Sequence, residues 1–405
     1  MNDRMHELGF SSLLQDRIPV ASMPAEGDAA PMRILVLSVS AGAGHVRAAE
    51  AIRRHAEMHR RDVSVIHLDA MDFAPSGFRM VYTDFYLKLV SRHPAVWSYL
   101  YQRSNEASHH SHWERLRRAT ERLCTRALRK KIADIKPDAI VCTHFLPAEM
   151  LSRMIAAGRV ECPVWVQVTD FDLHRMWVHD NMAGYFAANE EVAYRMRAGG
   201  INADKIHVTG IPVMPVFGQA CDRAECAGEF GIDPQRMTIL LMGGGAGMGR
   251  LDDVAERLLQ LNGHYQLVAL AGRNHTLLEA LRSVSERHRG RLVVQGYTEK
   301  IERLMACADV AVTKPGGLTV SECLAVGLPM IVNEPIPGQE ERNADFLLEQ
   351  GAALKACDPV TLEYRIRYLL RNPEKLADMR AKAAALAQPD AALRVLERIT
   401  GKVSA

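Results

Sequence analysis

Residues 32–45 have the sequence Met-Arg-Ile-Leu-Val-Leu-Ser-Val-Ser-Ala-Gly-Ala-Gly-His. The apolar run from Ile34 to Val39 is long enough for one buried β-strand. The glycines that follow predict a turn, and the Ala-, Arg- and Glu-rich sequence to about His59 predicts a helix. Backbone N–H groups are unpaired where a helix begins and attract anions, so this stretch predicts an anion-binding strand–turn–helix unit.

The same pattern continues and then restarts about 200 residues later. Further strands are predicted at residues 63–68, 139–143 and 164–169. A new strand at 237–242 ends in the glycine-rich residues 243–247 and is followed by a helix at 251–261. Strands at 267–271, 292–295, 310–313 and 329–333 complete the series. Alternating strands and helices predict an α/β protein made of parallel sheets with helices on both faces.

The length of 405 residues suits two domains rather than one core. We expect a disordered leader at 1–31, an N-terminal domain at 32–213, a C-terminal domain at 214–385 and a helical tail at 386–405. Pro212 and Pro215 mark the junction. The leader has five acidic residues and no apolar core, so no signal peptide is expected, and no apolar run is long enough to span a bilayer.

Composition excludes some classes of protein. A net charge of +2 does not favour a general nucleic-acid binder. The eight cysteines are scattered without a C-x-x-C pair, which favours reduced, buried thiols in a reducing compartment. Cys221 and Cys226 could form half of a metal site, but no second half follows at a usable distance.

Residues 78–131 interrupt the α/β pattern. They hold twelve Lys and Arg against four Asp and Glu, a local balance of +8, and eight of the 24 aromatic residues. Aromatic rings favour the headgroup level of a membrane, and basic clusters are attracted to anionic lipid. This segment, which includes Arg117, Arg118 and Arg122, is therefore a candidate membrane contact. The alternative is an ordinary basic helix whose aromatic residues form its own core.

His45 lies at the start of the first predicted helix. The positive end of a helix disfavours an imidazolium, so the ring should stay neutral and available as a base. Ligands of open α/β sheets bind at the carboxyl edge of the strands, where this residue falls. A purely structural histidine is the alternative.

Residues 314–325, Lys-Pro-Gly-Gly-Leu-Thr-Val-Ser-Glu-Cys-Leu-Ala, are the most informative run. Gly316 and Gly317 permit close backbone approach to a phosphate, and Thr319 can supply a hydroxyl. Glu322, one turn into the helix, can accept both hydroxyls of a ribose. The glycine loops at residues 42–44 and 243–247 do not fit the fingerprint of a dinucleotide-binding loop or of a P-loop. A dehydrogenase remains an alternative because Asp69 closes the second predicted strand.

Four of these stretches, at 40–45, 169–177, 271–274 and 314–322, resemble the motifs of monogalactosyldiacylglycerol synthases. The bacterial processive diacylglycerol glucosyltransferases share them, and the enzyme that adds N-acetylglucosamine to lipid I is more distantly similar. The resemblance covers about Met32 to Ala385. It implies a GT-B fold, in which two Rossmann-like domains face each other across a cleft and the C-terminal one binds the donor.

Carried onto matching positions, the resemblance implies roles for individual residues. His45 would be the catalytic base, with Asp170 beside it, and Glu322 would hold the ribose of a UDP-sugar. The remaining donor-binding residues would be Gly243, Gly244, Gly245, Arg273, Gly296, Tyr297, Gly316, Gly317, Leu318, Thr319, Gln339, Glu340 and Asn343. The acceptor side would include Gly42, Gly44, His174 and Trp177.

The implied activity is an inverting transfer of galactose or glucose from a UDP-sugar to 1,2-diacylglycerol. The implied location is the cytoplasmic face of the cell membrane, as a peripheral protein. Asp170 and Asp172 have the spacing of a metal-binding D-x-D motif, but after a strand we interpret them as acceptor-site or His45-supporting residues. No metal and no cofactor are expected, since the UDP-sugar is a substrate. Alternatives are transfer to another lipid-linked acceptor, or a UDP-sugar-binding protein without catalysis.

Overall fold

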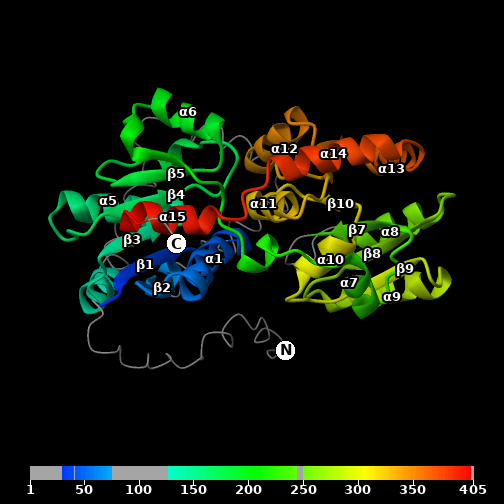
Figure 1. Ribbon diagram of the computed structural model, residues 1–405, viewed down its shortest axis with the longest axis horizontal. Coiled ribbons are helices and arrows are strands. Elements are labelled where there is room, and N and C mark those ends of the chain that lie inside the picture. Colours follow the sequence, from blue (N-terminus) through cyan, green and yellow to red (C-terminus); the bar gives the residue numbers. More distant parts are fainter. Residues whose placement is uncertain (1–29, 41, 75–125, 244–249, 403–405) are drawn as a thin grey trace, which may run out of the picture.

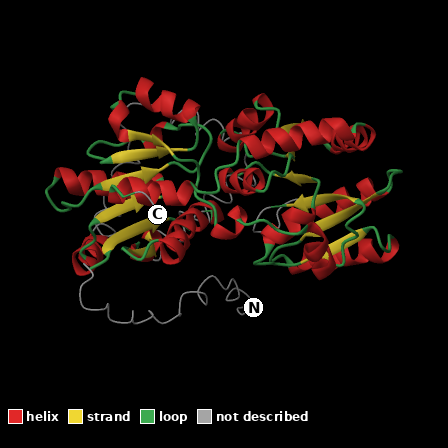
Figure 2. Ribbon diagram, in the orientation of Figure 1, coloured by secondary structure: helices red, strands yellow, loops and turns green. Residues whose placement is uncertain are grey.

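Two parallel six-stranded sheets organise the protein (Figure 1). The computed structural model describes residues 30–40, 42–74, 126–243 and 250–402. The first sheet has the order β2-β1-β3-β4-β5-β6 and the second has the order β12-β11-β10-β7-β8-β9. We call the parts built on these sheets the N-terminal unit and the C-terminal unit. Helices cover both faces of each sheet, as alternating strands and helices predict (Figure 2).

The N-terminal unit begins with the strand and helix of the glycine turn, β1 (Met32–Ser38) and α1 (Ala43–His59). Its other strands are β2 (Val63–Asp69), β3 (Ala139–Cys142), β4 (Val164–Gln167), β5 (Gly184–Ala187) and β6 (Ile206–Val208). Its other helices are η1 (Ala70–Phe73), α5 (Phe145–Ala156), η2 (Arg175–Trp177), α6 (Glu190–Ala198) and η3 (Ala203–Lys205), with a further helix over residues 126–135.

The C-terminal unit follows η4 (Pro215–Gly218). Its strands are β7 (Met237–Met242), β8 (Tyr265–Leu270), β9 (Leu292–Gln295), β10 (Val310–Thr313), β11 (Met330–Asn333) and β12 (Ala353–Ala356). Its helices are α7 (Arg223–Phe230), α8 (Leu251–Leu259), α9 (His275–Arg287), α10 (Ile301–Cys307), α11 (Gly317–Ala325), α12 (Gln339–Glu349), α13 (Pro359–Arg371) and α14 (Pro373–Ala385).

The strands that the sequence predicts are present, and three further strands complete the sheets. These are β5, β6 and β12, of four, three and four residues. Their sequences, Gly-Tyr-Phe-Ala, Ile-His-Val and Ala-Leu-Lys-Ala, contain Gly, Ala or polar residues that weaken the apolar β-strand signal. All three lie toward one edge of their sheet, β6 and β12 as the outermost strands.

The last helix returns to the N-terminal unit. After α14 the chain crosses back, and α15 (Ala391–Thr400) packs on α1 (Figure 1). Val395 and Leu396 are fully buried in a cluster with Ile34 and Ile52. The C-terminal tail, whose location the sequence did not predict, is therefore part of the N-terminal core.

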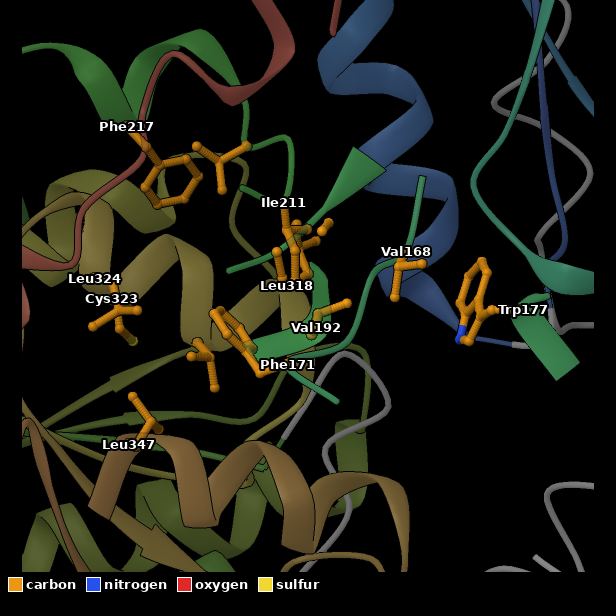
Figure 3. Packing of buried hydrophobic residues seen from close by; sticks show 14 of the residues in the cluster. Val168, Phe171, Trp177, Val192, Ile211, Phe217, Leu318, Cys323, Leu324 and Leu347 are labelled. Atoms are coloured by element: carbon orange, nitrogen blue, oxygen red, sulfur yellow. The ribbon is translucent and has the colours of Figure 1, made fainter. Parts of the chain in front are cut away.

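One of the clusters of buried apolar side chains includes residues of both units. Figure 3 shows Phe171 and Ile211 of the N-terminal unit among Leu318 and Cys323 of α11. Phe171 also stacks on Phe346 of α12, with ring centroids 4.7 Å apart. The two units therefore meet through a packed interface at the level of α11.

Some predicted features lie outside the described residues. These are the leader up to residue 29, Gly244 and Gly245, and most of the basic and aromatic segment, including Arg117, Arg118 and Arg122. In the described parts of the chain, every helix is too short or too polar to cross a bilayer.

Candidate functional site

His45 lies in the first turn of α1, directly after the buried strand β1. Gly42 precedes the helix with an extended backbone, at φ −166° and ψ 147°. The neighbouring strand β3 brings Thr143 to the same edge, because the carboxyl ends of adjacent parallel strands lie side by side. The imidazole Nδ1 of His45 lies 2.9 Å from the Thr143 carbonyl oxygen and 2.9 Å from Thr169 Oγ1.

These contacts fix the tautomer of His45. A carbonyl oxygen can only accept a hydrogen bond, so Nδ1 carries the proton and donates it to Thr143. The lone pair of the neutral ring is then on Nε2. Burial lowers the pKa of His45 to about 4, and the hydrogen bond to the Thr143 carbonyl opposes that shift. His45 is therefore neutral at pH 7, with Nε2 able to accept a proton.

Aromatic rings surround this imidazole. His144 makes an edge contact with His45 at 4.5 Å between centroids, and Trp177 lies 6.2 Å away. Phe145 lies edge-on to Trp177 at 5.9 Å. His144 Nδ1 accepts a hydrogen bond from the Leu146 N–H at the start of α5, and its pKa is lowered well below the usual value by burial. These rings place no charged group against the His45 imidazole, which is itself partly exposed.

The predicted acceptor-side residues have different surroundings. Trp177 is buried beside His45. His174 is also buried, and its Nδ1 accepts a hydrogen bond from the Met176 N–H at the start of η2. Gly42 is exposed, and Gly44 faces the C-terminal unit.

Glu322 lies across the interface from α1. The carboxylate is buried in α11, and its Oε1 accepts hydrogen bonds from Arg47 Nη2 at 3.0 Å and from Arg47 Nε at 3.3 Å. Burial raises the pKa of Glu322, and the Arg47 charge opposes that rise. The carboxylate that the sequence assigns to the ribose thus has a partner from the N-terminal unit.

The glycines of the two loops bring the units into direct contact. A Cβ atom on Gly317 would lie 2.1 Å from the Thr169 carbonyl oxygen, a distance that real Cβ atoms do not reach. A Cβ on Gly44 would lie 3.6 Å from Leu318 Cβ. The start of α11, where phosphate binding is predicted, therefore lies against the elements that hold His45.

Asp170 also bonds across the interface. Its Oδ1 accepts a 2.7 Å hydrogen bond from Gln339 Nε2 and a longer one of 3.5 Å from Asn343 Nδ2. Burial raises the pKa of Asp170 to about 6, while its hydrogen-bond partners, which include Trp177, lower it. The idea that Asp170 orients His45 needs correction, because the Thr143 carbonyl and the Thr169 hydroxyl hold that ring.

Asn343 is fully occupied by protein groups. Its Oδ1 accepts from the Phe171 N–H at 2.8 Å, and its Nδ2 donates to the Pro315 carbonyl at 3.1 Å. The side chain is completely buried. Glu340 likewise accepts a 2.7 Å hydrogen bond from the Ile336 N–H, and burial raises its pKa. In this arrangement Gln339 and Asn343 join the two units, so a sugar contact at either residue requires these bonds to rearrange.

Arg273 and Tyr297 lie together at the far end of the predicted donor site. The Arg273 guanidinium lies 4.4 Å from the centre of the Tyr297 ring. Gly296, just before this ring, follows β9, and a Cβ on it would lie 3.9 Å from the Gly272 carbonyl. Tyr297 is about half exposed, which leaves a π-face for a planar base.

Asp172 forms ion pairs rather than extending the carboxylate of Asp170. It lies 3.2 Å from Arg195 and 3.9 Å from Arg342. Over the described residues, no group of three or more His, Cys, Asp or Glu is arranged to hold a metal ion.

Sequence patterns did not single out Arg47, Thr143 or His144. Thr143 and His144 follow a predicted strand beside β1, so their position at the carboxyl edge was a usable signal. Arg47 gave no such signal, because its partner is 275 residues away.

Comparisons with known proteins give matches to both units of the chain. Residues 45–213 match the family model described as monogalactosyldiacylglycerol (MGDG) synthase, and residues 238–395 match the glycosyltransferase family 28 C-terminal domain. The processive diacylglycerol β-glucosyltransferase of Bacillus pumilus is 32% identical over 58% of this chain and 62% of its own length. The chain matches less than two thirds of the length of that relative and of its Bacillus subtilis counterpart.

A plant relative matches over more of its length. Monogalactosyldiacylglycerol synthase 3 of Arabidopsis thaliana is 28% identical over 95% of this chain and 84% of its own length. Among solved structures, Acinetobacter baumannii MurG superposes with a TM-score of 0.61 at 18% identity, over 92% of this chain and all of that one. The chain therefore has the GT-B fold, and its two units match a monogalactosyldiacylglycerol synthase model and a glycosyltransferase family 28 C-terminal domain model.

Proposed function

We propose that this protein is an inverting glycosyltransferase that moves a hexose, galactose or glucose, from a UDP-sugar onto 1,2-diacylglycerol. One observation carries the proposal. His45, neutral and with Nε2 free of the proton that Nδ1 donates to Thr143, lies on the turn that faces the start of α11. A general base and an anion-binding helix start therefore meet at one interface. The relatives named as diacylglycerol and monogalactosyldiacylglycerol enzymes support the choice of substrates.

The proposed reaction is a single displacement. The acceptor hydroxyl oxygen forms a bond to the anomeric carbon while Nε2 of His45 takes the hydroxyl proton. The bond between the anomeric carbon and the diphosphate oxygen breaks from the opposite side, so the configuration inverts. UDP leaves as an anion that the N–H groups at the start of α11 and the helix dipole stabilise. This scheme uses no metal and no cofactor.

The donor is proposed to lie along the C-terminal unit. Gly316, Gly317, Leu318 and Thr319 hold the diphosphate, with the loop that begins at Gly243 nearby. Glu322 accepts from the ribose hydroxyls, and Arg273, Gly296 and Tyr297 flank the uracil. Gln339, Glu340 and Asn343 approach the sugar once their bonds to the N-terminal unit and the loop at Ile336 release.

The acceptor is proposed to reach His45 from a membrane surface. Phe145 and Trp177 supply an apolar wall next to the base. In the helix over residues 126–135, Arg129, Lys130 and Lys131 are exposed while Leu128 and Ile132 are buried. The described end of the basic segment therefore directs its charges to solvent, which suits an anionic membrane surface on the cytoplasmic side.

The test is transfer of radiolabelled hexose from UDP-galactose and UDP-glucose to diacylglycerol in mixed vesicles. Label that enters the organic phase with diacylglycerol supports the proposal, and the preferred donor identifies the sugar. If the label moves only to another lipid in a panel of acceptors, that lipid and not diacylglycerol is the acceptor. UDP-sugar binding without any transfer overturns the enzymatic proposal in favour of a binding protein.

A further inference from the structure

Arg47 is the charged residue of α1 that reaches the predicted ribose site. It lies two residues after His45, and its Nε and Nη2 both contact Oε1 of Glu322. The Arg47 side chain is 39% exposed, whereas that of Glu322 is 8% exposed. Arg47 can therefore be reached from solvent while its partner is covered.

Two pairs of contacts define how α1 and α11 lie against each other. Gly44 faces Leu318, and Arg47 bonds to Glu322. Residues three or four apart share one face of a helix, so these pairs lie along the facing sides of both helices. The pairs advance in the same direction along each helix. The N-termini of α1 and α11, with their partial positive charges, therefore lie at the same end of the contact.

A bound donor would compete with Arg47 for the Glu322 carboxylate. A ribose that uses both of its hydroxyls on Glu322 competes with Arg47 for Oε1. The hydroxyls can replace hydrogen bonds, but they bring no charge. The released guanidinium then needs another anion, since an unpaired charge at a partly buried site is costly. The start of α11 is about 7.5 Å from Glu322 along the helix axis, at 1.5 Å per residue, within reach of a long side chain.

We infer that Arg47 is a donor-positioning residue that moves from Glu322 to the diphosphate of a bound UDP-sugar. The inference rests on the proposed function. In the structure Arg47 pairs with Glu322 and joins the two units. In the loaded protein the ribose takes Glu322, and Arg47 adds a fixed positive charge to the two helix N-termini around the leaving UDP.

The experiment compares uridine with UDP as ligands of the full chain, by calorimetry at fixed ionic strength. Uridine has the ribose and base but no phosphate. Arg47→Gln removes the charge, and Arg47→Lys restores a positive charge without the planar fork. Arg54→Gln is the matched control, since Arg54 is on the same helix two turns further along and pairs only with Glu50 and Glu57 among its contacts in the structure. Thermal unfolding of each variant shows whether it folds.

The expected result separates the two ligands. Arg47→Gln should weaken UDP about tenfold or more, the usual effect of losing a charge-assisted hydrogen bond. Uridine affinity should stay the same or rise, because the competition for Glu322 is gone. Arg47→Lys should recover part of the UDP affinity, and Arg54→Gln should match the parent protein. Arg47→Gln should lower kcat by a larger factor than it raises the KM for the donor, because the contact strengthens as UDP leaves.

Other outcomes overturn the inference in distinct ways. Equal weakening of uridine and UDP shows that Arg47 only supports Glu322. If Arg47→Gln binds both ligands more tightly, the Arg47–Glu322 pair only opposes ligand binding, and Arg47 has no contact with the bound diphosphate. If the parent protein binds UDP as expected and either pattern appears, the proposed function stands and the inference falls. Failure of the parent protein to bind UDP at all overturns the proposed function together with the inference.

Discussion

Gln339 donates a 2.7 Å hydrogen bond from Nε2 to Oδ1 of Asp170, and so connects α12 to the loop after β4. The bond joins a residue predicted to contact the donor sugar with one predicted to support catalysis. Both belong to the surface along which the two units meet. Because Asp170 is buried by this contact, its protonation is coupled to the interface.

Asp170 should make stability depend on pH. Its pKa is about 6 in the folded chain against an ordinary value of 3.8, so the native state binds more protons between these two values. Its contribution to stability is complete below pH 3.8 and is lost as the pH rises through 6. Asp170→Asn removes this loss and keeps an acceptor for Gln339. Relative to the parent protein, the variant should gain on the order of 1 kcal/mol between pH 5 and pH 8.

Urea unfolding at the two pH values measures this difference. The prediction fails if the stability gap between Asp170→Asn and the parent protein is constant with pH.

Replacing His45 should separate catalysis from donor binding. His45→Gln keeps a polar side chain but removes the proton acceptor, so kcat should fall about 10²- to 10⁴-fold. UDP affinity, measured by calorimetry, should be nearly unchanged. His59→Gln on the same helix is the control, since His59 is exposed at the far end of α1. Loss of UDP binding together with turnover would make His45 a structural residue.

Gly317 should tolerate no side chain. Its Cβ would fall 2.1 Å from the Thr169 carbonyl oxygen, so Gly317→Ala should push the units apart at a cost of about 1–3 kcal/mol. Gly316→Ala is a close control, because its Cβ would make an ordinary 3.8 Å contact with Glu340. Small-angle scattering should show a larger radius of gyration for Gly317→Ala alone, with lower donor kcat/KM. Identical behaviour of the two variants would contradict the close contact.

The C-terminal helix should stabilise the N-terminal unit. Leu396 is fully buried against β1 and α1, and Leu396→Ala should cost about 2–5 kcal/mol in the free energy of unfolding. Arg394→Ala on the exposed side of α15 should change it by less than about 0.5 kcal/mol. Denaturant titration compares the two. Equal effects would show that α15 packs elsewhere in solution.

Membrane binding should depend on charge. Reversal of Arg129, Lys130 and Lys131 to Glu should reduce co-sedimentation with anionic vesicles, since each basic residue near the surface contributes about 1 kcal/mol. The same reversal at Arg117, Arg118 and Arg122 should act alike, and salt should weaken binding of the parent protein. Exposed residues on another helix, such as Arg282 on α9, provide the control. Binding insensitive to both salt and charge reversal would leave the segment as an ordinary basic helix.

The sequence alone determined the class of fold and much of its layout. Strands β7 and β10 begin and end where the apolar runs predict, because a strand buried on both faces has a continuous apolar sequence. The glycine turns and the Lys314-to-Glu322 run likewise mark their own local structure. The family resemblance is confirmed by the two domain models.

Only the tertiary structure decided which distant groups meet. Local patterns encode burial, turns and helix starts, but they do not encode the surface that a second unit covers. The Arg47–Glu322 pair, the Gln339–Asp170 bond and the return of α15 to α1 each join segments that are far apart in the chain. The tautomer of His45 belongs to the same class, because it depends on a carbonyl oxygen 98 residues away that only the sheet order brings next to the ring.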